Sequence, residues 1–183
     1  MTSWSLLPVV LVLLCSNILC SLGCDLTQGL QEDFLLLNQM STSSLVPCLK
    51  DGTNFNFPKE ALDGSQLQKE NATVIVHEMV QQIFILFSQN TTPATWNQTR
   101  VIQLLIGLDQ QLEQLERCLE QDVEWEESSL GSENPRLALK SYFQGISQYL
   151  HSKVYSHCAW EIVRVEIRRL FLFMNKLTRN LRN

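Results

Sequence analysis

The sequence predicts an all-α bundle of five helices held by two disulfides. Five segments carry apolar residues at alternating steps of three and four, the spacing that keeps a stripe on one face of an α-helix. Only 7 Gly and 5 Pro occur among 183 residues, which disfavours a turn-rich β-sandwich. An even number of cysteines remains once an amino-terminal leader is removed, which in an exported chain indicates disulfides.

The leader is predicted at residues 1–23. Residues 6–19 form an apolar run of the length of a signal-peptide core, too short and too terminal for a good membrane span. Ser21 and Gly23 are small residues at the −3 and −1 positions of a cleavage site. We therefore expect a secreted, soluble, extracellular product with one helical domain over residues 24–183.

That domain holds four cysteines, Cys24, Cys48, Cys118 and Cys158. Four cysteines allow three pairings, and the residues alone leave the choice open. Zinc is the competing use of four cysteines, but none of these lie in CxxC pairs. We expect two disulfides and no metal.

The helical segments are separated by turn-rich or acidic stretches. We expect helices over residues 26–40, 72–88, 95–121, 135–150 and 158–183. Residues 41–70 contain Ser, Asn, Gly and Pro breakers and predict a long connection, which a bundle needs when consecutive helices run parallel. Residues 122–134 predict a solvated acidic loop, and Pro135 suits the first turn of the next helix.

The last helix combines a core stripe with a cationic side. Its apolar residues at helical spacing are Trp160, Val163, Ile167, Leu170, Met174, Leu177 and Leu181. The cations predicted on roughly the opposite side are Arg164, Arg168, Lys176, Arg179 and Arg182. Val165 and Leu172 lie among those cations, outside the stripe. One interpretation is a surface helix with stray apolar residues; the other is a basic, partly apolar surface that contacts another protein.

Charge and modification signals favour the second interpretation. Residues 109–133 hold nine carboxylates against one Arg, while residues 159–183 hold six Lys or Arg against two Glu. Such asymmetry orients encounter with a partner, whereas the net charge of −5 disfavours nucleic acid. The sequons lie elsewhere, at Asn71, Asn90 and Asn97, and predict N-glycosylation around the second helix.

No pattern predicts catalysis. The three histidines complete no HExxH motif, since Gln81 stands where the second His would be required after His77. No nucleophile elbow or phosphate-cradling glycine loop occurs in the sequence. We expect no enzymatic activity and no cofactor.

Four blocks in the same order resemble the type I interferons over nearly the whole mature length. The blocks are CDL at 24–26, CLKD with FNFP at 48–58, HEMVQQIFILF at 77–87 and CAWEIVRVEI at 158–167. The subtype stays open among alpha, omega, tau and the divergent zeta (limitin) type. The resemblance implies a long-chain helical cytokine that acts as a monomer. It bridges two receptor chains without entering the membrane and triggers Janus kinase/STAT antiviral, antiproliferative and immunomodulatory signalling.

The resemblance also implies which residues do this. The disulfides would be Cys24–Cys118 and Cys48–Cys158. The high-affinity receptor chain would meet Leu49, Arg164, Val165, Arg168, Arg169 and Leu172. The low-affinity chain would meet Phe84, Arg100, Leu105, Asp109 and Lys140. The sequence departs from the family where Gly52 replaces a loop arginine and where Leu105 and Asp109 replace aromatic residues, so we expect altered binding there.

A second function class is a secreted helical carrier that encloses an apolar ligand. It is motivated by the broad apolar girth of residues 72–88. A third, a secreted hydrolase, needs a titratable cluster that the sequence does not supply.

Overall fold

The computed structural model describes residues 26–62, 69–121 and 125–180. The leader predicted at residues 1–23 lies outside them. None of the described residues forms a strand, and the all-α prediction is confirmed. The elements are α2 (Thr27–Gln39), the 3-10 helix η1 (Val46–Asp51), α3 (Lys59–Leu62), α4 (Lys69–Ser88), α5 (Gln98–Gln121), α6 (Trp125–Ser152) and α7 (His157–Asn180).

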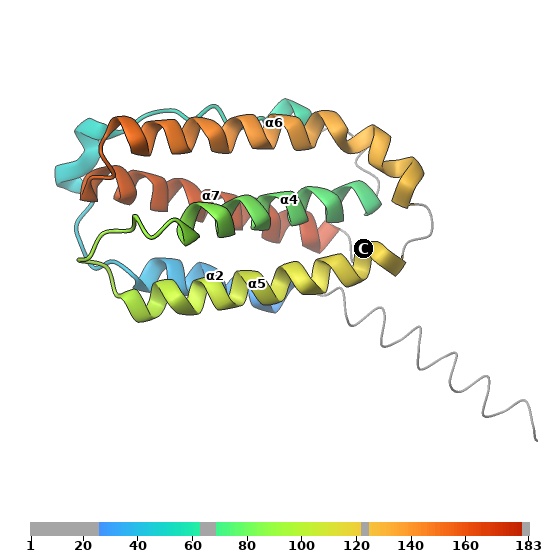
Figure 1. The fold of residues 1–183 in the computed structure, drawn as a ribbon, viewed down its shortest axis with the longest axis horizontal. Coiled ribbons are helices and arrows are strands. Elements are labelled where there is room, and N and C mark those ends of the chain that lie inside the picture. The colour runs from blue at the N-terminus through green and yellow to red at the C-terminus, as the bar shows by residue number, and fades with distance from the viewer. Residues whose placement is uncertain (1–25, 63–68, 122–124, 181–183) are drawn as a thin grey trace, which may run out of the picture.

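Among the described residues, the five long helices, α2, α4, α5, α6 and α7, lie side by side (Figure 1). α4 packs against α5, α6 and α7, while α2 packs against α5 and α7. α2 and α4 run in the same direction, so the chain must return along the whole bundle between them (Figure 1). The predicted long connection makes that return, passing one end of the bundle as η1 and then contacting α6 through α3.

The core collects the predicted apolar stripes. On α7, five stripe residues, Trp160, Val163, Ile167, Leu170 and Met174, are buried. Trp160 packs with Phe87 of α4 and with Trp96, at ring centroid distances of 5.5 and 5.7 Å. The broad apolar girth of α4 also enters the core, because Ile75, Val76, Met79, Val80 and Ile83 are buried in the same cluster. The apolar surface of α4 that motivated the carrier hypothesis is therefore covered by the neighbouring helices.

α5 begins slightly later than predicted because a cap fixes its start. The helix starts at Gln98 rather than near Thr95. The side-chain oxygen of Asn97 accepts a hydrogen bond from the backbone N–H of Arg100 at 3.2 Å. This arrangement is the usual N-cap, in which a side chain satisfies one of the free N–H groups of the first turn.

The predicted acidic loop before Pro135 is wrong for residues 125–134, which are helical. α6 starts at Trp125 and includes Pro135 in its interior. Serine, glycine and acidic residues predicted a loop, yet this stretch also holds Trp, Glu and Leu, which a helix accepts. Proline in a helix removes one backbone hydrogen bond and commonly bends the axis. The amino-terminal end of α6 bends away from the rest of the helix in Figure 1.

A carboxyl group is buried between α2 and α5. Asp33 is 1% exposed, and Gln111 Nε2 of α5 donates a hydrogen bond to its Oδ2. Gly107 faces the same carboxyl, so a Cβ at this position would collide with Asp33 Oδ1. Burial raises the pKa of Asp33 from its usual 3.8 to about 7; the hydrogen bond from Gln111 opposes the rise, and the nearby Glu32 charge adds to it.

We therefore expect stability to fall as pH rises from about 4 to about 7. The folded state keeps the Asp33 proton across this window while the unfolded state releases it, so folding takes up a proton. The contribution is fully present below pH 3.8 and lost above about pH 7. A rise of the pKa from 3.8 to about 7 corresponds to roughly 4 kcal/mol at most. Asp33→Asn should raise the unfolding free energy at pH 8 and flatten this slope in urea titrations. Glu32→Gln removes only the smallest of the three contributions to the Asp33 pKa and should reduce the slope slightly, whereas equal slopes in Asp33→Asn and the parent would contradict the assignment.

Candidate functional site

The Cys48–Cys158 disulfide joins the long connection to the start of α7, and this predicted pair is confirmed. The two Cα atoms are 4.9 Å apart across a sequence separation of 110 residues. η1 and α7 are in contact along this junction. Cys118 is also disulfide-bonded, while Cys24, its predicted partner, lies outside the described residues. The Cys24–Cys118 pairing stays a prediction.

Further contacts hold η1 in place from the other side. Tyr149 of α6 donates a hydrogen bond from its hydroxyl to the Asp51 carbonyl at 2.8 Å, and Lys153 pairs with the Asp51 carboxylate at 3.1 Å. Phe55 packs edge-on against the Tyr149 ring at 5.2 Å. Leu49 nevertheless remains 61% exposed on η1. A fixed backbone therefore presents an apolar side chain to solvent.

The open side of α7 adjoins this segment of the chain. Leu172 is 56% exposed, and Val165 and Arg168 are half-buried. The Arg169 side chain is 66% exposed and pairs with Glu166 at 3.0 Å, while Tyr142 donates to the same carboxylate at 2.8 Å. Val46, 72% exposed on η1, is a further apolar residue near this region that the sequence analysis missed.

Arg164 departs from the prediction that placed it on the open side. It is 7% exposed, and its guanidinium donates to Glu161 Oε2 at 2.7 and 3.0 Å and to the Leu37 carbonyl of α2 at 3.3 Å. The helical wheel contained the signal, since Arg164 lies four residues after Trp160 and so only ~40° from it. The angle of Arg164 on the helix therefore predicts its burial, although its charge favours exposure. Its receptor contact stays a prediction, and the structure adds a packing role.

Glu161 is the centre of a buried polar network. Its Oε1 accepts hydrogen bonds from Ser41 at 2.5 Å and from the Trp96 indole at 2.7 Å. Burial alone would raise the pKa of Glu161, but the hydrogen bonds from Ser41, Arg164 and Trp96 outweigh it and lower the pKa. The network ties the end of α2 and the turn before α5 to α7. It thereby sets the position of the first turns of the α7 face.

The residues predicted for the low-affinity receptor chain lie on α4, α5 and α6. Phe84 and Leu105 are half-buried, Asp109 is exposed, and Arg100 donates to Gln103 at 3.0 Å. The Lys140 ammonium lies 4.0 Å from the buried carboxylate of Glu78, and Lys140 also lines a groove between α4 and α6. The sequence analysis missed the exposed apolar residues Ile85, Ile102 and Ile106 on these helices.

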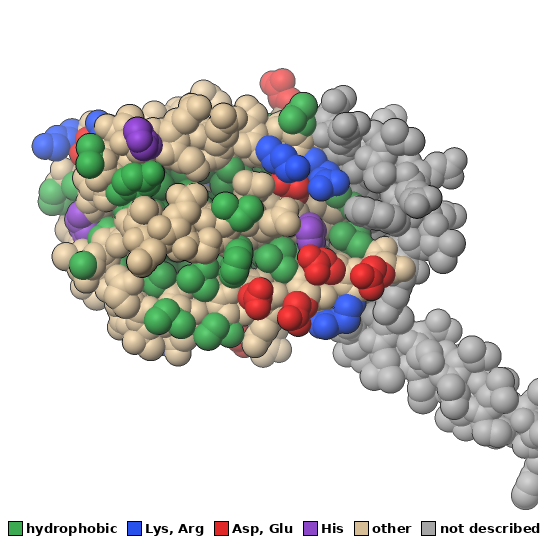
Figure 2. Space-filling model, in the orientation of Figure 1, with side chains coloured by type: hydrophobic (Ala, Val, Ile, Leu, Met, Phe, Trp, Pro, Cys, Tyr) green, Lys and Arg blue, Asp and Glu red, His purple; other side chains and the backbone are tan. Residues whose placement is uncertain are grey.

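Figure 2 shows this side of the molecule, with apolar side chains spread over α4 and α5 and carboxylates gathered toward the carboxyl end of α5. Exposed apolar side chains and carboxylates therefore occupy different parts of α5. Two of the three sequons border this face, since Asn90 and Asn97 are exposed in and beside the loop from α4 to α5. Asn71 is part of α4, but its side chain lies outside the described residues.

Within the described residues, these faces are accompanied by neither a metal-binding cluster nor a membrane-spanning helix. Among the described residues, no group of three or more His, Cys, Asp or Glu could hold a metal ion. The helices that the structure describes include none that is both long and apolar enough to cross a bilayer. The surface of η1 and α7 and the surface of α4, α5 and α6 can each pair charges with another protein and bury apolar side chains against it.

Comparison with known proteins gives a consistent result. The family model for the interferon alpha/beta domain matches residues 22–181. Interferon alpha-16 of Homo sapiens is 48% identical over 184 residues, which cover 98% of this chain and 97% of that protein. Interferon omega-2 of Equus caballus is 50% identical over 155 residues, covering 82% of this chain and 80% of that protein. The solved structure of zebrafish interferon 2 superposes with a TM-score of 0.68 at 25% identity, covering 82% of this chain and 96% of that one.

Proposed function

Because this chain belongs to the type I interferon family, a family of non-enzymatic cytokines with receptor-mediated antiviral signalling, we propose that it bridges the two chains of the type I interferon receptor. The high-affinity chain binds the surface formed by Leu49, Val165, Arg168, Arg169 and Leu172, and the low-affinity chain binds α4, α5 and α6. The bridged receptor then signals through Janus kinases and STAT proteins.

One observation carries the proposal for the high-affinity surface. The Cys48–Cys158 disulfide holds η1 against the start of α7, so the exposed Leu49 belongs to the same rigid unit as the exposed cations of α7. A rigid surface that joins apolar and arginine side chains is typical of protein interfaces. Preorganisation also lowers the entropy lost on binding.

The test is binding of the oxidised, secreted protein to the isolated ectodomain of the high-affinity receptor chain. We expect saturable binding that Arg169→Ala weakens by about 1–3 kcal/mol, as for interface arginines. Arg117→Ala is a matched control, because Arg117 is 64% exposed and pairs with Glu113 on its own helix, as Arg169 does with Glu166. A folded protein with intact disulfides that fails to bind would refute the proposal.

Gly52→Arg should strengthen this binding by roughly tenfold. It restores the arginine that the family resemblance places in the loop, and a charge-assisted hydrogen bond contributes about 1.5–3 kcal/mol. The backbone dihedral of Gly52, with φ −57°, suits a non-glycine residue, but a Cβ would lie 3.0 Å from the Leu49 carbonyl oxygen, so the end of η1 must shift by a few tenths of an ångström. Gly52→Gln controls for side-chain length without charge. An affinity for Gly52→Arg equal to that of the parent would contradict the prediction.

Cleavage of the leader, the monomeric state, glycosylation and the subtype are further proposals that rest on the family. We propose that residues 1–23 are a cleaved signal peptide, which amino-terminal sequencing of the secreted protein would test by starting at Cys24. The protein then acts outside the cell as a monomer, with glycans at Asn71, Asn90 and Asn97 that glycosidase treatment and mass spectrometry would count.

Among subtypes we propose the divergent zeta (limitin) type, motivated by Gly52 and the altered low-affinity positions. A ratio of affinities for the two receptor chains equal to that of an alpha or omega interferon would contradict this assignment.

A further inference from the structure

Two glycines allow a carboxyl group and an amide to meet between α2 and α5. The Asp33 carboxyl of α2 lies against Gly107 of α5, where an added Cβ would collide with Asp33 Oδ1. The Gln111 side chain of α5 lies against Gly29 of α2, where an added Cβ would be 3.3 Å from Gln111 Cγ. On each helix the polar residue follows the glycine by four positions, so glycine and polar residue share one face. The two faces therefore fit together around this one polar contact.

One oxygen atom of this contact has no hydrogen-bond donor. Asp33 and Gln111 are 1% and 3% exposed, and Gln111 Nε2 donates to Asp33 Oδ2. Gln111 Oε1 is buried and accepts no hydrogen bond from the residues that the structure describes. A buried acceptor without a donor is costly, because it has lost water and gained no partner. An ionised Asp33 only accepts hydrogen bonds, whereas the protonated acid carries one O–H donor that could satisfy this oxygen.

We propose that Asp33 and Gln111 form a proton-operated latch between α2 and α5. In the closed latch Asp33 is a neutral acid whose O–H donates to Gln111 Oε1, while Gln111 Nε2 donates to the other carboxyl oxygen. The carboxyl reaches this arrangement by turning about its last side-chain torsion, which is soft. Loss of the proton removes the donor and leaves two acceptors facing each other, so the latch opens and α5 holds α2 less firmly.

The Asp33 carboxyl keeps its proton through the mildly acidic range. Burial raises its pKa from 3.8 to about 7 in the folded protein. When α2 opens, the carboxyl enters water and its pKa returns to the usual 3.8, so opening releases a proton. Opening should therefore become about tenfold more frequent with each pH unit between about 4 and 7. α2 is thus held firmly at pH 5–6, where pH-sensing proteins commonly switch, and least firmly above pH 7.

Charged groups surround the latch on all three helices. Glu32 of α2 is exposed, and its charge adds to the rise of the Asp33 pKa after burial and the opposing hydrogen bond from Gln111. On α7, Arg164 donates to the Leu37 carbonyl of α2, and Arg168 lies 5.6 Å from the centre of the Phe34 ring. The charged residues of α5 within two turns of Gln111 are exposed; they are Asp109, Glu113, Glu116 and Arg117. The charges on α5 and α7 are not among the causes of the Asp33 shift, so Asp33 itself is the titrating group.

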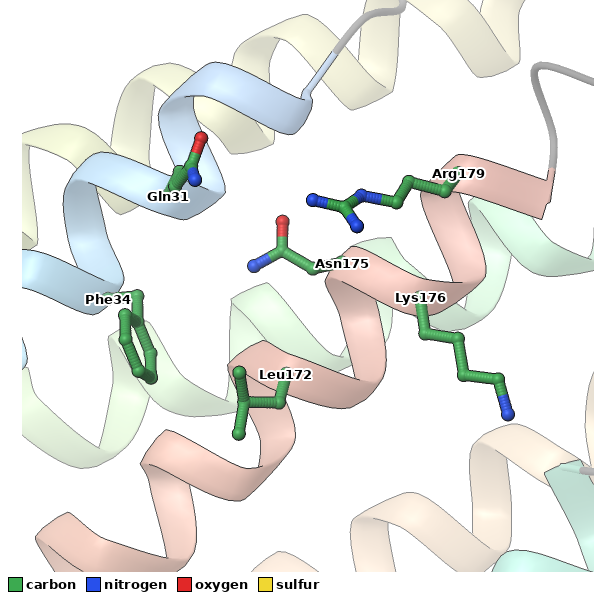
Figure 3. Close-up of a pocket in the computed structure, with 6 residues that line it drawn as sticks. All are labelled: Gln31, Phe34, Leu172, Asn175, Lys176 and Arg179. Atoms are coloured by element: carbon green, nitrogen blue, oxygen red, sulfur yellow. The ribbon is translucent and has the colours of Figure 1, made fainter.

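α2 connects the latch to α7. The helix packs against both α5 and α7. Asp33 contacts α5, whereas the next residue, Phe34, faces Leu172 of α7 (Figure 3). The Leu37 carbonyl, one turn further along, accepts a hydrogen bond from Arg164. Weakening the contact with α5 therefore leaves α2 attached through α7 alone, and we expect the whole of α2 to respond to pH.

Hydrogen exchange of the α2 amides tests the latch in the folded, oxidised protein. Asp33→Asn is the matched variant, because its amide offers both a donor and an acceptor to Gln111 at every pH. The ratio of α2 exchange rates, parent over Asp33→Asn at the same pH, should rise about tenfold per pH unit between about pH 5 and 7. Glu113→Gln, at an exposed carboxyl of α5, should exchange like the parent. A ratio that stays constant over this range would overturn the proposal.

Two further measurements separate the latch from burial alone. The ¹³C shift of the Asp33 carboxyl carbon should titrate with a midpoint near 7, and a midpoint near 3.8 would contradict the assignment. Asp33→Leu is uncharged, as Asp33→Asn is, but offers no hydrogen bond to Gln111. Its α2 amides should exchange at least about tenfold faster than those of Asp33→Asn, because the Gln111 amide stays unpaired. Circular dichroism checks that both variants are folded, and equal exchange in the two would show that Gln111 is not the partner.

Discussion

Arg164→Ala is expected to lower the free energy of unfolding by about 3–5 kcal/mol, the usual result of removing one partner from a buried ion pair. Glu161 is fully buried and would keep hydrogen bonds from two neutral donors, Ser41 and Trp96, with the His157 ring 3.9 Å away. The Leu37 carbonyl of α2 would also lose its bond from Arg164. A typical domain is stable by about 5–15 kcal/mol, so the variant should lie close to unfolding.

Equilibrium unfolding in urea measures this effect. Arg169→Ala is the matched control, since its side chain is 66% exposed and its pair with Glu166 should contribute no more than about 1 kcal/mol. Arg164→Lys should recover part of the loss by keeping the charge without the forked geometry. Similar unfolding midpoints for Arg164→Ala and Arg169→Ala would show that the network does not stabilise the fold.

The unfolding free energy of Arg164→Ala decides how receptor-binding data for this variant are interpreted. Loss of binding in Arg164→Ala would combine a lost contact with a displaced or unfolded α7, because the network positions the first turns of that helix. Arg169→Ala removes an exposed side chain and leaves the network intact. Arg169 is therefore the informative position for the interface, and Arg164 the informative position for the fold.

Replacing Cys48 and Cys158 together by Ala should lower the unfolding free energy by about 4–5 kcal/mol. The bridge closes a loop across 110 residues, and the chain-entropy model gives a value of this size for a loop of about 100 residues. The double variant is preferable to a reducing agent, because Cys118 is disulfide-bonded as well and would also be reduced. Urea unfolding of the oxidised parent and the variant measures the difference.

A second double variant gives a control for packing. Cys48 is buried, so part of the loss could come from the smaller side chain. Comparing Cys48→Ser/Cys158→Ser with the Ala pair separates the side-chain contribution from that of the bridge. Receptor binding by the folded fraction should weaken too, because Leu49 would depend on the Tyr149 and Lys153 contacts alone. A double variant as stable as the parent would contradict the chain-entropy account.

Two kinds of sequence signal, helical spacing and the family resemblance, account for the features that could be predicted. Helical spacing of apolar residues identified the five long helices and the core stripe of α7, because burial of one face repeats every few residues and is visible locally. The cysteine count left three pairings open, and the resemblance to type I interferons supplied the Cys48–Cys158 pair. The start of α6 was missed because loop composition is a weaker signal than periodicity, and Pro135 was assigned to a first turn.

The sequence by itself determined the helices, their apolar faces and the family to which the chain belongs. Only the tertiary structure decided which polar groups are buried and with what partners. Arg164 meets a carbonyl 127 residues away, and Asp33 meets an amide 78 residues away. Periodicity fixes the angle of a side chain on its own helix. It does not specify what the neighbouring helix places there, and that neighbour decides whether burying a charge is favourable.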